Sequence, residues 1–135
     1  MDSVFSIYLG HNQHTSYAYF VKPWCELAEF KTMTDSYLPM ILSNTAEVQA
    51  IQPGLSIMAV FYKPVSLKIS STESIQPNQP CILIYKKMGS QKVIWVSDPT
   101  RKLSSIQIQI GTKTMNVTLP TGDYKGSTVK AIMPN

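Results

Sequence analysis

The sequence predicts an all-β protein: a single-domain antiparallel β-sandwich or partly closed barrel over residues 1–135, with at most one or two short helical turns. Stretches rich in β-branched and aromatic residues recur about every ten residues, turn-forming residues separate them, and several alternate apolar with polar side chains. With 135 residues, 44% of them hydrophobic, the chain is long enough to bury one core.

The first part of the chain gives the weakest β signals. We expect strands at 4–9 and 16–21, where apolar and aromatic residues cluster. A further strand is expected at 24–33, although its apolar spacing also fits a helix. Pro39 restricts residues 37–42 to an edge strand or an extended connection.

The middle of the chain has clearer boundaries. Asn44–Glu47 combines a cap residue with a Glu three positions later, which predicts one helical turn. Gln52-Pro53-Gly54 predicts a tight turn into a strand at 55–62. A shorter alternating strand follows at 65–70, and residues 71–80, rich in Ser, Gln, Asn and Pro, are expected to form a loop.

The strongest signal is a β-hairpin. Two β-branched runs, 82–87 and 92–97, flank the Gly-bearing loop at 88–91. Its apolar body predicts a central core element, while three lysines crowd its tip. We therefore expect this element to supply both core and charge.

A second hairpin follows. Residues 104–110 alternate strictly, which places Ile106, Ile108 and Ile110 inward, and Gly111 begins a turn into a second alternating run ending at Leu119. A last short strand is expected at 127–133.

Charge is divided unevenly along the chain. Residues 1–62 carry two bases and five acids, net −3, whereas residues 63–135 carry ten bases and three acids, net +7. A sandwich tends to gather its hairpins and turns at its ends, so we expect the bases there to form one patch for an anionic membrane or RNA. The candidate residues are Lys86, Lys87, Lys92, Arg101, Lys102, Lys113, Lys125 and Lys130.

Catalytic and metal-binding patterns are absent from the sequence. His11 and His14 lack the further ligands that a metal site needs. Glu26 and Glu29 would point to opposite faces of a strand, which does not suit paired acid–base chemistry. No P-loop, dinucleotide fingerprint or nucleophile elbow occurs. The sequence therefore predicts a protein that is not an enzyme, with no metal and no cofactor.

Cys25 and Cys81 both resemble small buried hydrophobes, with a disulfide between them left as an alternative. Residues 1–4 lack the blocks of a signal sequence, so we expect an intracellular, reducing setting.

A family resemblance extends over residues 16–90. Its elements are Ser16-Tyr17 followed by Val21-Lys22-Pro23-Trp24, then Gln52-Pro53-Gly54 leading into residues 56–61, and an aliphatic run ending in bases at 82–87. In this layout the chain resembles the matrix proteins of non-segmented negative-strand RNA viruses, of the bornavirus type. The resemblance implies a non-catalytic β-sandwich that forms oligomers, commonly tetramers, lies beneath the viral envelope and binds RNA.

Residues and resemblance together predict a self-assembling viral matrix-type protein, in the virion beneath the envelope, in the host cytoplasm or at the inner face of a host membrane. Its expected partners are further copies of itself, an anionic membrane, and single-stranded RNA or nucleoprotein. Trp24, Phe30, Tyr37 and Met40 are the expected subunit contacts. The alternative is an oligomeric RNA-binding or capsid-like β module without membrane affinity.

Overall fold

The computed structural model describes residues 26–32 and 39–133. The chain divides into two compact units, residues 1–32 and 33–135, and each is considered by itself. The described part of the first unit contains α1 (Leu27–Thr32). The expected strands at 4–9 and 16–21 lie outside the described residues. That the whole chain forms one domain stays a prediction.

Helix α1 shows that the strand expected at 24–33 was wrong. Its Leu, Ala, Glu and Lys residues are strong helix formers, and the Thr32 hydroxyl donates a hydrogen bond to the Glu29 carbonyl. Local helix propensity therefore outweighed the apparent alternation. Among the described residues, no helix is both long and apolar enough to cross a membrane.

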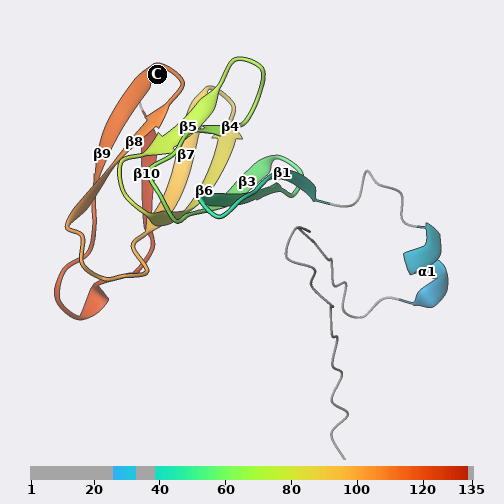
Figure 1. The fold of residues 1–135 in the computed structure, drawn as a ribbon, viewed down its shortest axis with the longest axis horizontal. Coiled ribbons are helices and arrows are strands. Elements are labelled where there is room, and N and C mark those ends of the chain that lie inside the picture. Colours follow the sequence, from blue (N-terminus) through green and yellow to red (C-terminus); the bar gives the residue numbers. More distant parts are fainter. Residues whose placement is uncertain (1–25, 33–38, 134–135) are drawn as a thin grey trace, which may run out of the picture. The chain divides into compact units, whose positions relative to one another are not determined.

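The second unit is a sandwich of two antiparallel sheets, which confirms the predicted fold class (Figure 1). The six-stranded sheet has the order β1-β2-β3-β6-β7-β10, and the four-stranded sheet has the order β4-β5-β8-β9. The strands are β1 (Met40–Asn44), β2 (Val48–Gln52), β3 (Ser56–Phe61), β4 (Leu67–Lys68), β5 (Ser74–Pro77), β6 (Cys81–Met88), β7 (Gln91–Ser97), β8 (Ser105–Ile110), β9 (Lys113–Thr118) and β10 (Val129–Met133), with the short 3-10 helix η2 (Gly122–Tyr124) before β10.

Both predicted hairpins are confirmed, and they fall in different sheets. β6 pairs with β7 and β8 pairs with β9. In the first hairpin only two residues separate the strands, and Gly89 adopts φ +62°, a left-handed conformation that suits glycine. The predicted edge strand and last strand also exist, as β1 and β10.

Two local predictions were wrong. Asn44–Glu47 forms the β1–β2 turn and no helix, because the Thr45 hydroxyl accepts the Val48 N–H at 3.1 Å while the Thr45 N–H bonds back to the Val48 carbonyl. The loop expected at 71–80 contains β5, whose Ile75 is fully buried opposite Ile110 of β8. Its period-2 pattern is too short to stand out from the polar residues around it.

The core lies between the inner faces of the two sheets. The inward isoleucines of β8 are fully buried, as predicted, and they pack in one cluster with side chains of the six-stranded sheet such as Phe61, Leu83 and Val96. Cys81 joins this cluster as a free, buried cysteine, as expected. Burial, and then the charge of Asp98, raise the pKa of its thiol to about 12, so it stays protonated. Cys25 lies outside the described residues.

A buried aspartate fixes the turn after β7. Asp98 is only 2% exposed, and its carboxylate accepts the N–H groups of Thr100, Lys102 and Leu103 and the Thr100 hydroxyl, at 2.6–2.8 Å. The turn holds Arg101 at φ +60°. Burial alone would raise the pKa of Asp98, but these hydrogen bonds lower it to about 2.

We predict that Asp98→Asn lowers the free energy of unfolding by about 3 kcal/mol at pH 7, because one carboxylate oxygen and its two bonds are lost. The folded-state pKa of Asp98 lies below the ordinary 3.8. The contribution of its carboxylate to the free energy of unfolding is therefore present above pH 3.8 and is lost as the pH falls towards 2. Urea denaturation should therefore show the two proteins converging in acid. The exposed Asp123→Asn is the matched control, and a constant difference between pH 7 and pH 2 would contradict this role.

Candidate functional site

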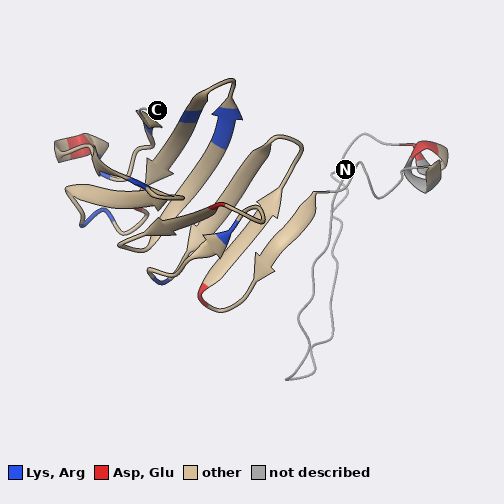
Figure 2. Ribbon diagram, turned by 90° about the horizontal axis from the view of Figure 1, so that it is seen from above, with Lys and Arg blue, Asp and Glu red and all other residues tan. Residues whose placement is uncertain are grey.

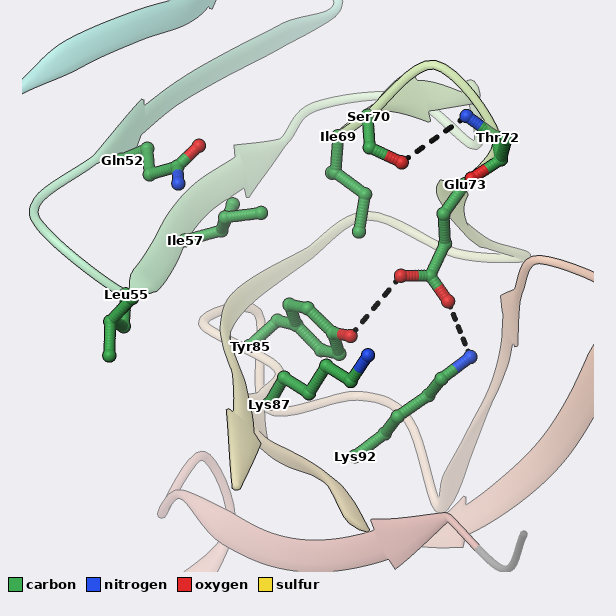
Figure 3. Close-up of a pocket in the computed structure, with 10 residues that line it drawn as sticks. All are labelled: Gln52, Leu55, Ile57, Ile69, Ser70, Thr72, Glu73, Tyr85, Lys87 and Lys92. Carbon is green, nitrogen blue, oxygen red and sulfur yellow. Dashed lines mark hydrogen bonds and ion pairs between the residues drawn. The ribbon is translucent and has the colours of Figure 1, made fainter. Parts of the chain in front are cut away.

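Three side chains form a polar network at one end of the sandwich (Figure 3). Glu73 lies just before β5, Tyr85 on β6 and Lys92 on β7. The Tyr85 hydroxyl donates a hydrogen bond to Glu73 Oε2 at 3.3 Å, and the Lys92 ammonium forms an ion pair with Glu73 Oε1. Because Glu73 leads into the four-stranded sheet, the network ties the two sheets together.

The environment of Tyr85 keeps its phenol protonated. Burial raises its pKa to about 12, and the charge of Glu73 and the hydrogen bond to it act in the same direction. At neutral pH the hydroxyl is therefore protonated and donates its hydrogen bond to Glu73.

A cleft of about 470 Å³ opens beside this network. It combines apolar side chains with amide, hydroxyl, carboxylate and ammonium groups, which is the mixture found in sites for polar organic ligands. The lining residues are Gln52, Leu55, Ile57, Ile69, Ser70, Thr72, Glu73, Tyr85, Lys87 and Lys92 (Figure 3).

The cleft carries an excess of positive charge. Lys87 and Lys92 are directly opposite each other in the β6–β7 pairing, a position where like charges repel. Glu73 neutralises Lys92, whereas no ion-pair partner of Lys87 occurs within residues 26–32 and 39–133. Two ammonium groups and one carboxylate leave a net charge of +1, so the cleft favours an anion.

The described residues contain no group of three or more His, Cys, Asp or Glu side chains that would hold a metal ion.

The predicted basic residues do not form one patch, and Figure 2 shows their segments dispersed over the sandwich. Four of the bases lie at the end of the sandwich near the cleft. Lys86, Lys87 and Lys92 lie at the β6–β7 hairpin tip, and Lys113 follows the turn at Gly111, which lies beside Glu73.

A second group lies at the opposite end of β7, in the turn after β7 and in the segment after η2. There the Arg101 side chain packs against Gly126. These bases are Arg101, Lys102 and Lys125, while Lys130 lies on β10.

The expected subunit contacts are only partly described. Trp24 and Tyr37 lie outside the described residues, and Phe30 lies in α1. Met40 begins the edge strand β1 and is 56% exposed. Whether these residues or the bases bind a partner stays a prediction.

The outer face of the six-stranded sheet is apolar, a feature the sequence analysis missed. Strand pairing aligns one row across the sheet, and residues opposite each other in antiparallel strands share a face. The row consists of Ile41, Ile51, Met58, Ile84, Trp95 and Lys130. The Lys130 ammonium covers the Trp95 ring, 5.8 Å from its centre.

The same outer face is hollowed. A groove of about 330 Å³ runs over β2, β3 and β6, and its side chains include Ile51, Met58 and Ile82, which are 38–42% exposed. The outer face of the four-stranded sheet differs sharply, because its exposed residues include Gln76, Gln107, Gln109 and Asn116. Only one sheet therefore has the polar outer face that is common where antiparallel sheets meet water.

Comparison with known proteins explains this sandwich. Residues 40–107 match the family described as polysaccharide lyase family 8, C-terminal beta-sandwich domain. The chain belongs to this family. The match begins at β1 and ends within β8, so it takes in the complete cleft and the apolar groove.

A curated protein and a solved structure agree with this assignment. Chondroitinase-AC of Pedobacter heparinus is 28% identical over 138 residues, which cover 94% of this chain and 20% of that protein. A solved structure, described as the active site of chondroitinase AC lyase revealed by enzyme–oligosaccharide complexes and mutagenesis, matches with a TM-score of 0.68 at 27% identity, over 79% of this chain and 17% of that one. The chain thus spans about a fifth of the length of these relatives.

These findings overturn the viral interpretation. The relatives are polysaccharide lyases, so the matrix-protein resemblance, the virion and host-membrane location and the expectation of a non-enzymatic protein are contradicted. The alternative of an RNA-binding or capsid-like module does not fit either. The resemblance to a viral matrix protein came from features that many β-sandwiches share: short strands, proline turns and bases at hairpin tips. Self-association was not tested by these comparisons and stays a prediction.

Glu73 was also missed. It lies in a Ser-rich segment that predicted a solvated loop, and its partners are 12 and 19 residues away along the chain. Its only signal in the sequence is that it is the sole acid between Lys63 and Asp98.

We predict that Tyr85→Phe lowers stability by about 2 kcal/mol at pH 7, because a hydrogen bond to a carboxylate is lost. The folded-state pKa of about 12 exceeds the ordinary 10.0, so above pH 10 the unfolded chain releases a proton that the folded chain keeps, and wild-type stability falls towards pH 12. Alkaline titration followed by tyrosine absorbance should show a late-ionising group in the wild type that is missing in Tyr85→Phe. Tyr62→Phe, at an exposed position, is the control that retains it. A late group that persists in Tyr85→Phe would contradict the assignment.

Proposed function

We propose that this chain serves as the C-terminal β-sandwich domain of a polysaccharide lyase that acts on acidic polysaccharides of the chondroitin type. Family membership supports the domain assignment, and the name of the curated relative supports the substrate class. In this role the sandwich is one part of an enzyme whose other parts make up most of its length.

The observation that carries this proposal is the apolar outer face of the six-stranded sheet. Solvent-exposed isoleucine and methionine side chains in one continuous row cost free energy unless another surface covers them. In the proposed enzyme, the remaining part of the lyase packs on this apolar face. The polar outer face of the four-stranded sheet stays in contact with water. The row would thus fix the sandwich in place.

Elimination by a lyase requires a group that accepts a proton from the sugar. Tyr85 is held protonated and Glu73 is engaged by both Tyr85 and Lys92. The proposal therefore assigns proton abstraction to the larger remaining part of the enzyme, with the sandwich supporting its structure.

A domain exchange tests the proposal. In Pedobacter heparinus chondroitinase AC, the segment that this chain matches is replaced by this chain. Chondroitin cleavage is followed by the ultraviolet absorbance of unsaturated sugar ends. We expect a soluble, active chimera. Met58→Lys with Ile82→Lys should lower the yield of active chimera about tenfold, because two ammonium groups would be placed in an apolar interface.

The matched control is Gln107→Lys with Gln109→Lys, which adds the same charge to the polar outer face of the four-stranded sheet. This pair should leave the activity unchanged. The proposal is contradicted if the chimera is inactive while the enzyme with its own segment put back is active. It is also contradicted if the two double-lysine variants lose the same amount of active chimera.

A further inference from the structure

We infer that the cleft between the sheet ends is a binding site for the anionic group of an acidic sugar, separate from the apolar face and served by Lys87. The ligand class rests on the function proposed above, whereas the charge and shape of the cleft do not.

The first argument is the placement of charge. The pairing of β6 with β7 puts two ammonium groups on the same side of one hairpin, and among the described residues only Lys92 is matched by a carboxylate. Lys87 and Tyr85 lie two residues apart on β6, so both side chains are on the face of the strand that lines the cleft (Figure 3). A bound anion would relieve the repulsion between the lysines and would satisfy Lys87 by a charge-assisted hydrogen bond.

The second argument is the surface facing these charges. Leu55, Ile57 and Ile69 supply an apolar wall, and Gln52 and Ser70 add an amide and a hydroxyl. Sugar rings present apolar C–H faces together with hydroxyl edges, so this mixture fits a charged monosaccharide unit better than a bare inorganic ion. The volume of about 470 Å³ accommodates one or two sugar units.

Glu73 sets the strength of the site. Its carboxylate cancels one of the two positive charges and holds Lys92 in place. Removal of this negative charge should strengthen anion binding, a sign opposite to that expected for a residue that only supports the fold.

The test is titration of the complete chain with an unsulfated chondroitin tetrasaccharide, with its sulfated form, and with a neutral oligosaccharide of equal length, by calorimetry and by NMR of the methyl groups. We expect both acidic sugars to bind, the neutral sugar not to bind, and the methyl signals of Leu55, Ile57 and Ile69 to shift. Lys87→Met should weaken binding about tenfold, and Glu73→Gln should strengthen it several-fold.

Lys125→Met is the matched control, because it removes the same charge near the opposite end of the sandwich and should change affinity less than twofold. Equal weakening by Lys87→Met and Lys125→Met would overturn the inference, because it would show attraction by net charge alone. Weaker binding by Glu73→Gln, or binding of the neutral sugar without sensitivity to Lys87, would also overturn it.

The two proposals fail separately. If acidic sugars bind this chain through Lys87 but the chimera is inactive, the anionic-sugar site stands and the lyase role is contradicted. An active chimera whose sandwich does not bind acidic sugars would remove only the site.

Discussion

The register of the β6–β7 hairpin determines which of its side chains face the core, the cleft and the outer face of the six-stranded sheet. It places Leu83 opposite Val96 in the core, Lys87 opposite Lys92 at the cleft, and Ile84 opposite Trp95 on the outer face. A slip of one residue would exchange the two faces, burying ammonium groups and exposing the core. The two-residue turn at Gly89 and the packed core hold this register against such a slip.

The two outer faces of the sandwich differ in polarity, which is the basis of the docking role proposed above. Gln107 and Gln109 cover the four-stranded sheet with groups that water solvates, whereas Met58 and Ile82 leave the six-stranded sheet apolar. The cleft is lined by the inward-facing ends of β6 and β7, so the proposed docking would use a different face of the sheet from the cleft. A structural role and a ligand site can therefore coexist in one small domain.

Local sequence predicted the elements whose signals are confined to a few residues. Strict alternation around Ile108 predicted both strand and burial, and the Gly-bearing loop predicted the hairpin. Predictions failed where two local signals competed or where a strand was too short. In α1, helix propensity outweighed the apparent alternation. The Thr45 side chain stabilises a turn where a helix was predicted. Strand β5 is too short to predict locally and is defined by its pairing with β8, where Ile75 lies opposite Ile110.

The sequence by itself determined the all-β class, the two hairpins and the inward isoleucines, because period-2 alternation and turn chemistry act within a few residues. Only the tertiary structure decided which charges meet. Glu73 reaches Tyr85 and Lys92 because two sheets fold over each other. Lys92 is thereby neutralised, whereas Lys87 has no such partner in the described part of the chain. The apolar row on the outer face likewise depends on the register between strands, since its members are scattered along the chain and become neighbours only when the sheet forms.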